Sequence, residues 1–219
     1  MVELLGPLID DQGAIATAIS APLQRAGVEL RPGALDQVAG MSPVHALKTL
    51  IEGHGRFELL EELEDLTLAA EQGIAAWASS GRLRSPEGAL DGWRHLAASG
   101  ATLAVLSSIP GDLAQRAAER LGIVVHENEW LVAADELGTP RPDRLGERFE
   151  GAGSVALVGS IGAALAVAAT GCRAIIAVGR SPGAAMLADV TVPALEGPGS
   201  PLWQELMARA AEPGGDSAA

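Results

Sequence analysis

The chain has 219 residues, of which 48% are hydrophobic, so it can bury a sizeable core and is not disordered as a whole. Its 15 basic and 28 acidic residues give a formal net charge of −13. This charge argues against nucleic-acid partners and anionic membranes, because their phosphate groups would be repelled. The single cysteine, Cys172, excludes an intrachain disulfide and a cysteine-based zinc cluster. The acidic N-terminus lacks the basic region of a secretory signal, and we expect a cytoplasmic protein.

The first third of the chain is predicted to be helical after one short strand. Ser42-Pro43 marks a helix start, because Ser is a favoured N-cap and Pro suits the first helical position. Apolar residues three or four positions apart continue the helical pattern on both sides of this dipeptide. The acidic run over 61–65 is expected to be the solvent face of the last helix. The predicted elements are a strand over 2–5 and helices over 12–27, 42–52 and 57–79.

After Gly81, short apolar strands alternate with helices of ten or more residues. This alternation is typical of a parallel sheet covered by helices on both faces. The uncharged stretch 151–172 is long enough to suggest a membrane span, but its glycines favour a buried strand, a tight turn and a buried helix. The predicted helices are 86–99, 111–121, 143–149 and 161–170, and the predicted strands are 101–106, 123–126, 154–158 and 173–178.

These patterns predict an α/β protein with a Rossmann-like parallel-sheet core and an inserted all-helical cap. The core is expected over 1–11 and 85–195, the cap over 12–84, and a tail with a short helix over 196–219. Ligands bind such sheets beyond the carboxyl ends of the strands, which here carry Glu3–Gly6, Ser107-Ser108 and Gly159-Ser160. Because the insertion follows the first of these ends, the cap is expected to lie over that crevice.

Several segments, in order along the chain, carry a family resemblance. They are Gly6-x-Leu8-x-Asp10, Ala39-Gly-Met-Ser-Pro43, Leu106-Ser107-Ser108, Gly138-Thr-Pro-Arg-Pro-Asp143 and Val158-Gly159-Ser160. They are similar to the end of the opening D-x-D-G-T-L-x-D motif, a common cap segment and the three later motifs of the haloacid dehalogenase superfamily. The resemblance covers residues 1–193. It implies the helical-cap branch that includes the β-phosphoglucomutase-like and phosphonatase-like phosphohydrolases.

The resemblance also implies the positions of the catalytic groups. In this family an Asp attacks phosphorus, a second Asp protonates the leaving group, a Lys steadies the phosphoryl group, and further acids complete a magnesium site. The matching positions in this chain hold Glu3, Leu5, Thr139 and Ser160. Leu5 has no proton to donate and Thr139 carries no charge. Phosphoryl transfer depends on positioning and charge neutralisation, so these replacements predict impaired or absent catalysis.

Some groups could compensate for these replacements or retain a binding role. The only lysine, Lys48, lies in the cap, whereas Arg141 is close enough to Thr139 in sequence to offer a guanidinium. Backbone N–H groups at strand-to-helix turns favour anions, so a phosphate or carboxylate could bind without turnover. The candidates for this anion binding are Gly6, Ser107, Ser108, Arg141 and Gly159.

The sequence therefore leads to a haloacid dehalogenase-like protein that is catalytically impaired or inactive. Its expected partner is a small ligand, phosphorylated or otherwise anionic, or another protein, with no nucleic acid, no membrane and no metal. The alternative is an active phosphatase-like hydrolase with Glu3 as nucleophile, Ser107 in the second motif and Mg²⁺ as cofactor. A third possibility is an interaction subunit that uses the surface of helix 57–79. The ligand and the oligomeric state stay open.

Weaker signals have simpler interpretations. Val158-Gly-Ser-Ile-Gly162 hints at a dinucleotide fingerprint with Arg180 as a phosphate reader, but Leu157 stands where its first glycine belongs. The histidines show no metal-ligand spacing, and His126 near acidic residues is more simply solvated. Cys172 starts a buried strand and is expected to be a small core residue.

Overall fold

The computed structural model describes most of the chain, including both the sheet and the inserted helices. The described residues are 1–100, 102–125, 130–132, 154–170, 172–195, 199, 200, 202–204, 206 and 208. No helix within these residues is long and apolar enough to cross a membrane. The predicted helix over 143–149 and the motif residues Thr139 and Arg141 lie outside them, as does His126.

The described part of the chain contains a six-stranded sheet in the order β3-β2-β1-β4-β5-β6, with every neighbouring pair parallel. The strands are β1 (Val2–Glu3), β2 (Val105–Ser107), β3 (Trp130–Val132), β4 (Val155–Val158), β5 (Ala174–Val178) and β6 (Val190–Val192). Val2 pairs with Val105 on one side and with Leu157 on the other. The short first strand therefore lies inside the sheet, and its end is flanked by the ends of β2 and β4.

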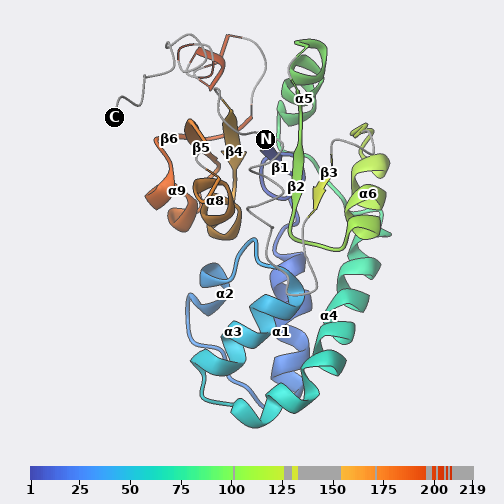
Figure 1. Cartoon of the computed structure of the whole chain (residues 1–219). Helices are drawn as coiled ribbons and strands as arrows, with labels where there is room; N and C mark the ends of the chain where they lie inside the picture. Colours follow the sequence, from blue (N-terminus) through green and yellow to red (C-terminus); the bar gives the residue numbers. More distant parts are fainter. Residues whose placement is uncertain are drawn as a thin grey trace.

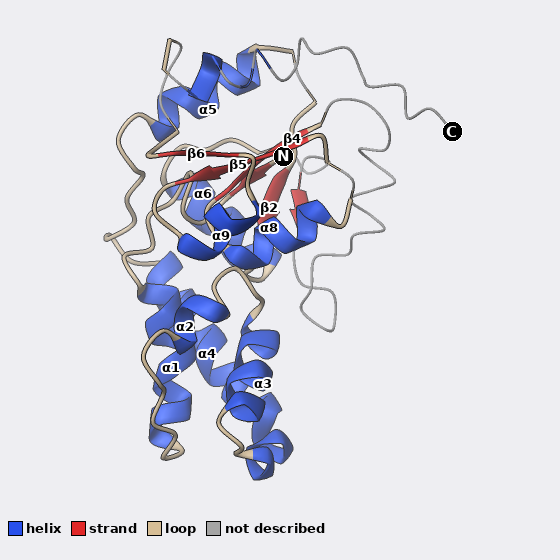
Figure 2. Cartoon of the chain, turned by 90° about the vertical axis from the view of Figure 1, so that its left-hand side faces the viewer, coloured by secondary structure: helices blue, strands red, loops and turns tan. Residues whose placement is uncertain are grey.

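Helices cover both faces of this sheet (Figure 2). They are α5 (Ala89–Ala98), α6 (Gly111–Arg120), α8 (Ile161–Ala168) and α9 (Pro182–Leu187). Val105 and Leu157 belong to the core shared with α5 and α6, whereas the adjacent Ala104 and Ala156 belong to the core shared with α8 and α9. Because successive side chains of a strand point to opposite faces, both faces are apolar. The predicted Rossmann-like architecture is confirmed.

The inserted helices form a separate group below the sheet in Figure 1, with a core of their own. They are α1 (Ala14–Arg25), α2 (Ala34–Gln37), α3 (Pro43–Gly53), the 3-10 helix η1 (Phe57–Glu62) and α4 (Leu63–Ala78). We call this group the cap. Its two connections to the sheet run side by side, because the Asp10 N–H donates to the Arg84 carbonyl at 2.9 Å.

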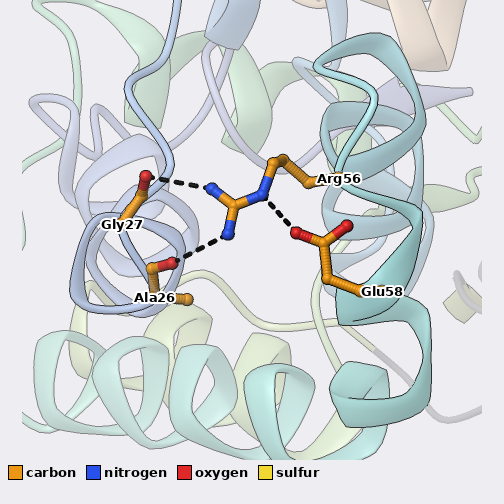
Figure 3. Close-up of polar contacts among 4 residues, drawn as sticks. All are labelled: Ala26, Gly27, Arg56 and Glu58. Atoms are coloured by element: carbon orange, nitrogen blue, oxygen red, sulfur yellow. Dashed lines mark hydrogen bonds and ion pairs between the residues drawn. The ribbon is translucent and has the colours of Figure 1, made fainter.

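Local contacts explain how the cap helices begin and end. Ser42 is the N-cap of α3 and accepts a hydrogen bond from the His45 N–H at 3.4 Å, and Pro43 occupies the first position, as predicted. The Arg56 guanidinium donates to the carbonyls of Gly27 at 3.0 Å and Ala26 at 3.4 Å (Figure 3). It also bonds Glu58 at 2.5 Å, which lowers the pKa of that carboxyl. Arg56 thereby ties the end of α1 to the start of η1.

Several predicted elements were wrong in extent. The helix predicted over 57–79 is divided into the 3-10 helix η1 and the α-helix α4. An apolar spacing of three or four residues fits both helix types, so the sequence pattern does not separate them. Residues 123–125 of the predicted strand over 123–126 are not a strand, and β3 lies later at Trp130–Val132. Ile123 is buried but Val124 is 68% exposed, so the apolar run does not continue into the sheet. β2 begins at Val105 rather than at Ala101, and α2, α9 and β6 were not predicted.

Candidate functional site

Glu3 is the central polar group of the site. It ends β1, between β2 and β4, and its side chain is only 2% exposed. One carboxylate oxygen, Oε2, accepts hydrogen bonds from the Gly159 N–H at 2.6 Å and the Ser160 N–H at 3.0 Å. The other oxygen, Oε1, accepts from the Ser160 hydroxyl at 2.5 Å. Both oxygens are thus engaged by the turn that follows β4.

The ionisation of Glu3 reflects two opposing effects. Burial disfavours the charged form, whereas the hydrogen bonds from Ser160 and Gly159 favour it. Burial prevails and raises the pKa of Glu3 from 4.5 to about 7. The carboxyl therefore changes its charge near neutral pH.

Ser160 links Glu3 to helix α8. It is the N-cap of this helix, and its Oγ accepts a hydrogen bond from the Ala163 N–H at 3.2 Å. The first N–H groups of a helix have no partner within the helix and attract anions. The Glu3 carboxylate lies next to this helix start, so the chain supplies its own anion at the turn where the sequence suggested that a ligand anion could bind.

Other predicted anion-binding groups are also engaged within the chain. The Gly6 N–H donates to the Ile9 carbonyl at 2.8 Å. The Ser107 hydroxyl donates to the Ile109 carbonyl at 3.1 Å and accepts from the Ile109 N–H at 3.3 Å, which closes the turn after β2. Ser108 is buried beside this turn.

A pocket of about 210 Å³ lies between the strand ends and the cap. The structure brings most of the predicted site residues to its wall, namely Glu3, Leu5, Gly6, Ser108, Gly159 and Ser160. Ser107 is not part of this wall among the described residues. The cap contributes an apolar wall that the sequence did not single out, including Ile15, Ile19, Leu35, Val38 and Met41. Ile15 and Ile19 stood out only through their helical spacing, because the core of a cap and the wall of a pocket have the same pattern.

The turn between α2 and α3 closes one side of this pocket by direct backbone contact with α8. The Gly162 N–H donates to the Ala39 carbonyl at 3.0 Å. A Cβ on Gly162 would lie 2.5 Å from the carbonyl carbon of Gly40, and a Cβ on Gly40 would lie 1.9 Å from the Ser160 Oγ. Glycine is therefore required on both sides of the contact, and Gly40 also has a positive φ of 78°.

The described residues do not fit a magnesium site of the kind that the family resemblance implies. Magnesium is held in near-octahedral oxygen coordination, commonly by one or two carboxylates. Within the part of the chain that the structure describes, no three His, Cys, Asp or Glu side chains cluster as metal ligands would. Both oxygens of Glu3 accept hydrogen bonds, and its closest polar side chain, Ser160, donates to it.

Asp10 and Asp11 have local roles at the start of the cap. The Asp11 Oδ2 accepts a hydrogen bond from the Ile15 N–H at 3.0 Å, in the first turn of α1, and Asp11 also lines the pocket. Asp10 accepts from the Gln12 N–H at 2.9 Å. Asp11 thus contributes a hydrogen-bond acceptor to the first turn of α1, although Gly13 is the N-cap of this helix.

Comparison with known proteins was informative at the level of structure only. No protein-family model matches the sequence, and no curated protein sequence does. A hydrolase from Pseudomonas syringae matches with a TM-score of 0.72 at 17% identity, over 89% of this chain and 92% of that one. β-Phosphoglucomutase from Clostridium difficile matches with a TM-score of 0.70 at 14% identity, over 94% of each chain.

A haloacid dehalogenase-like family protein from Streptococcus pneumoniae also matches, with a TM-score of 0.61 at 15% identity, over 87% of this chain and 90% of that one. These matches span the sheet and the cap together, since each covers most of both chains. At such low identity they speak to the fold alone. The chain therefore has the haloacid dehalogenase-like hydrolase fold, with structural neighbours in the helical-cap branch that contains β-phosphoglucomutase.

Proposed function

We propose that this protein does not transfer phosphoryl groups and instead binds a small ligand in the pocket between the sheet and the cap. The observation that carries the proposal is the state of Glu3. Its carboxylate accepts three hydrogen bonds from Gly159 and Ser160 and is almost fully buried.

A nucleophilic carboxylate needs an oxygen that can approach phosphorus in line with the leaving group, and small misplacements are costly. A displacement of about 1 Å lowers rates by about 100-fold. Glu3 is one methylene longer than the Asp of the family motif, and its oxygens are held by the β4–α8 turn. Two residues along, Leu5 lines the same pocket with a side chain that cannot donate a proton.

The pocket itself supports a binding role. It lies beyond the strand ends, where ligands of doubly wound sheets bind, and its opposite wall comes from the cap. The apolar cap residues offer surface to a ligand, while Ser108, Asp11 and Asp36 offer polar groups. Such a site can bind a small ligand without the charge neutralisation that phosphoryl transfer requires.

The experiment is a turnover assay on phenyl phosphate and a panel of sugar phosphates, with and without Mg²⁺. The wild-type protein is compared with Glu3→Gln and with Glu64→Gln, which removes an exposed acid of the cap instead. We expect no magnesium-dependent turnover by any of the three proteins. Magnesium-dependent turnover that is lost in Glu3→Gln but kept in Glu64→Gln would establish the alternative, an active phosphatase-like hydrolase.

A further inference from the structure

We infer that the pocket between the sheet and the cap takes a small organic cation, an amine attached to an apolar body, rather than a phosphorylated compound. This inference rests on the proposed function, because it names the ligand class of the same site. Three features of the pocket carry it: its size, its charge and the use that the chain already makes of its anion-binding groups.

The size and the cap wall define the body of the ligand. An engineered apolar cavity of about 150 Å³ holds one benzene molecule. The pocket has about 210 Å³, room for one ring or a short branched chain with a small polar group. Ile15, Ile19 and Val38 line it from the cap. Transfer of an apolar ligand group from water to contact with these side chains favours binding.

The charge of the wall defines the polar group of the ligand. Three acidic side chains line the pocket: Glu3 from the sheet, Asp11 from the start of the cap and Asp36 from α2. Among the described lining residues there is no lysine, arginine or histidine. A phosphate monoester would meet like charge at the cap side of the pocket, where Asp11 and Asp36 lie, whereas an ammonium group would meet opposite charge there.

Three backbone donors at the strand ends that could bind an anion are already engaged. The N–H groups of Gly159 and Ser160 donate to Glu3, and the Gly6 N–H donates to Ile9. A phosphate that takes these N–H groups would leave the Glu3 carboxyl buried without its partners. A buried polar group without hydrogen bonds is unfavourable, so the Glu3 contacts select against anionic ligands.

The test uses four compounds with the same ring: benzylamine, benzyl alcohol, benzoate and phenyl phosphate. Binding to the full-length protein is measured by saturation-transfer NMR and calorimetry. We expect benzylamine to bind at least about tenfold more tightly than the neutral and anionic compounds, the ratio typical of one charged hydrogen bond.

The variant Asp11→Asn removes the negative charge of Asp11 but keeps a side-chain oxygen that can accept the hydrogen bond from the Ile15 N–H. We expect it to weaken benzylamine about tenfold and to leave benzyl alcohol unchanged. Asp65→Asn is the matched control, since Asp65 is an exposed cap acid outside the pocket wall. Ala16→Met, which fills the pocket from the cap, should weaken every compound that binds there.

Because Asp36 could substitute for Asp11, the double variant Asp11→Asn/Asp36→Asn is measured as well. Three results would overturn the inference: phenyl phosphate binding as tightly as benzylamine, no binding of benzylamine, or benzylamine affinity in the double variant equal to that in Asp65→Asn. Phenyl phosphate that binds as tightly as benzylamine without releasing phenol refutes only the ligand class. Release of phenol with Mg²⁺ refutes the proposed function.

Discussion

The buried carboxyl of Glu3 makes a quantitative prediction about pH. Its pKa is about 7 in the folded protein, against 4.5 for an unperturbed glutamate carboxyl such as that of the unfolded chain. Between these two values the folded state keeps a proton that the unfolded state has lost, so the free energy of unfolding falls as pH rises. A shift of this size corresponds to about 3 kcal/mol, present in full below pH 4.5 and lost by about pH 7.

The perturbation is Glu3→Gln. The amide oxygen can accept from the Gly159 and Ser160 N–H groups as Oε2 does, and the amide NH₂ can donate to the Ser160 hydroxyl. The variant should therefore fold without the titrating group. We expect its unfolding free energy, relative to wild type, to increase by about 2.5 kcal/mol between about pH 5 and about pH 8, because a small part of the effect is already lost at pH 5.

The assay is urea unfolding at a series of pH values, with the wild-type protein, Glu3→Gln and the exposed control Glu64→Gln measured in parallel. Taking the difference between proteins cancels other titrating groups. One of these is the α-amino group of Met1, whose pKa burial lowers to about 6 and which donates to the Val155 carbonyl. If Glu3→Gln has the same pH dependence as wild type, the pKa of Glu3 is not raised to about 7.

The remaining predictions concern Glu3's partner, the cap contact and the cap's internal clamp. Ser160→Ala removes the N-cap of α8 and the hydroxyl donor to Glu3. We expect the free energy of unfolding in urea to fall by about 1–3 kcal/mol and the pKa of Glu3, measured by carboxyl NMR, to rise. An unchanged pKa would contradict the contact between Ser160 and Glu3. Gly162→Ala would stabilise an isolated helix by about 0.5–1 kcal/mol, but its Cβ meets Gly40. We therefore expect lower stability and faster hydrogen exchange at residue 162, whereas Gly53→Ala, which meets nothing within 4 Å, should show neither. Arg56→Ala should destabilise the cap by about 1–2 kcal/mol and speed exchange at η1; exchange equal to wild type would show that its bonds to Ala26 and Gly27 contribute nothing.

Short-range patterns predicted much of the fold. Ser42-Pro43 is a local signal, and α3 begins there because capping needs only residues close in sequence. The alternation of short apolar strands with helices predicted the parallel sheet, since each strand carries apolar residues for both faces. The boundaries failed where local periodicity is ambiguous, as at Phe57–Glu62, which forms a 3-10 helix.

The candidate site was predicted only in part, because its main contacts join residues far apart in the chain. Glu3 and Ser160 were both singled out, but their hydrogen bond spans 157 positions and depends on β1 lying beside β4. Similarly, Ala39-Gly40-Met41 was noted as a cap-like segment, yet its packing on Gly162 depends on the position of the cap relative to the sheet. Thr139 and Arg141 lie outside the described residues, so their part in the site stays a prediction.

The central claim is that the Glu3 carboxylate is held by the start of α8 and holds neither a metal nor a phosphoryl group. A crystal structure of the protein grown with Mg²⁺ and phosphate tests this most directly. The account predicts that Glu3 still accepts hydrogen bonds from Gly159 and Ser160, with no magnesium bound to its oxygens. A magnesium ion coordinated by Glu3, with phosphate beside it, would contradict it.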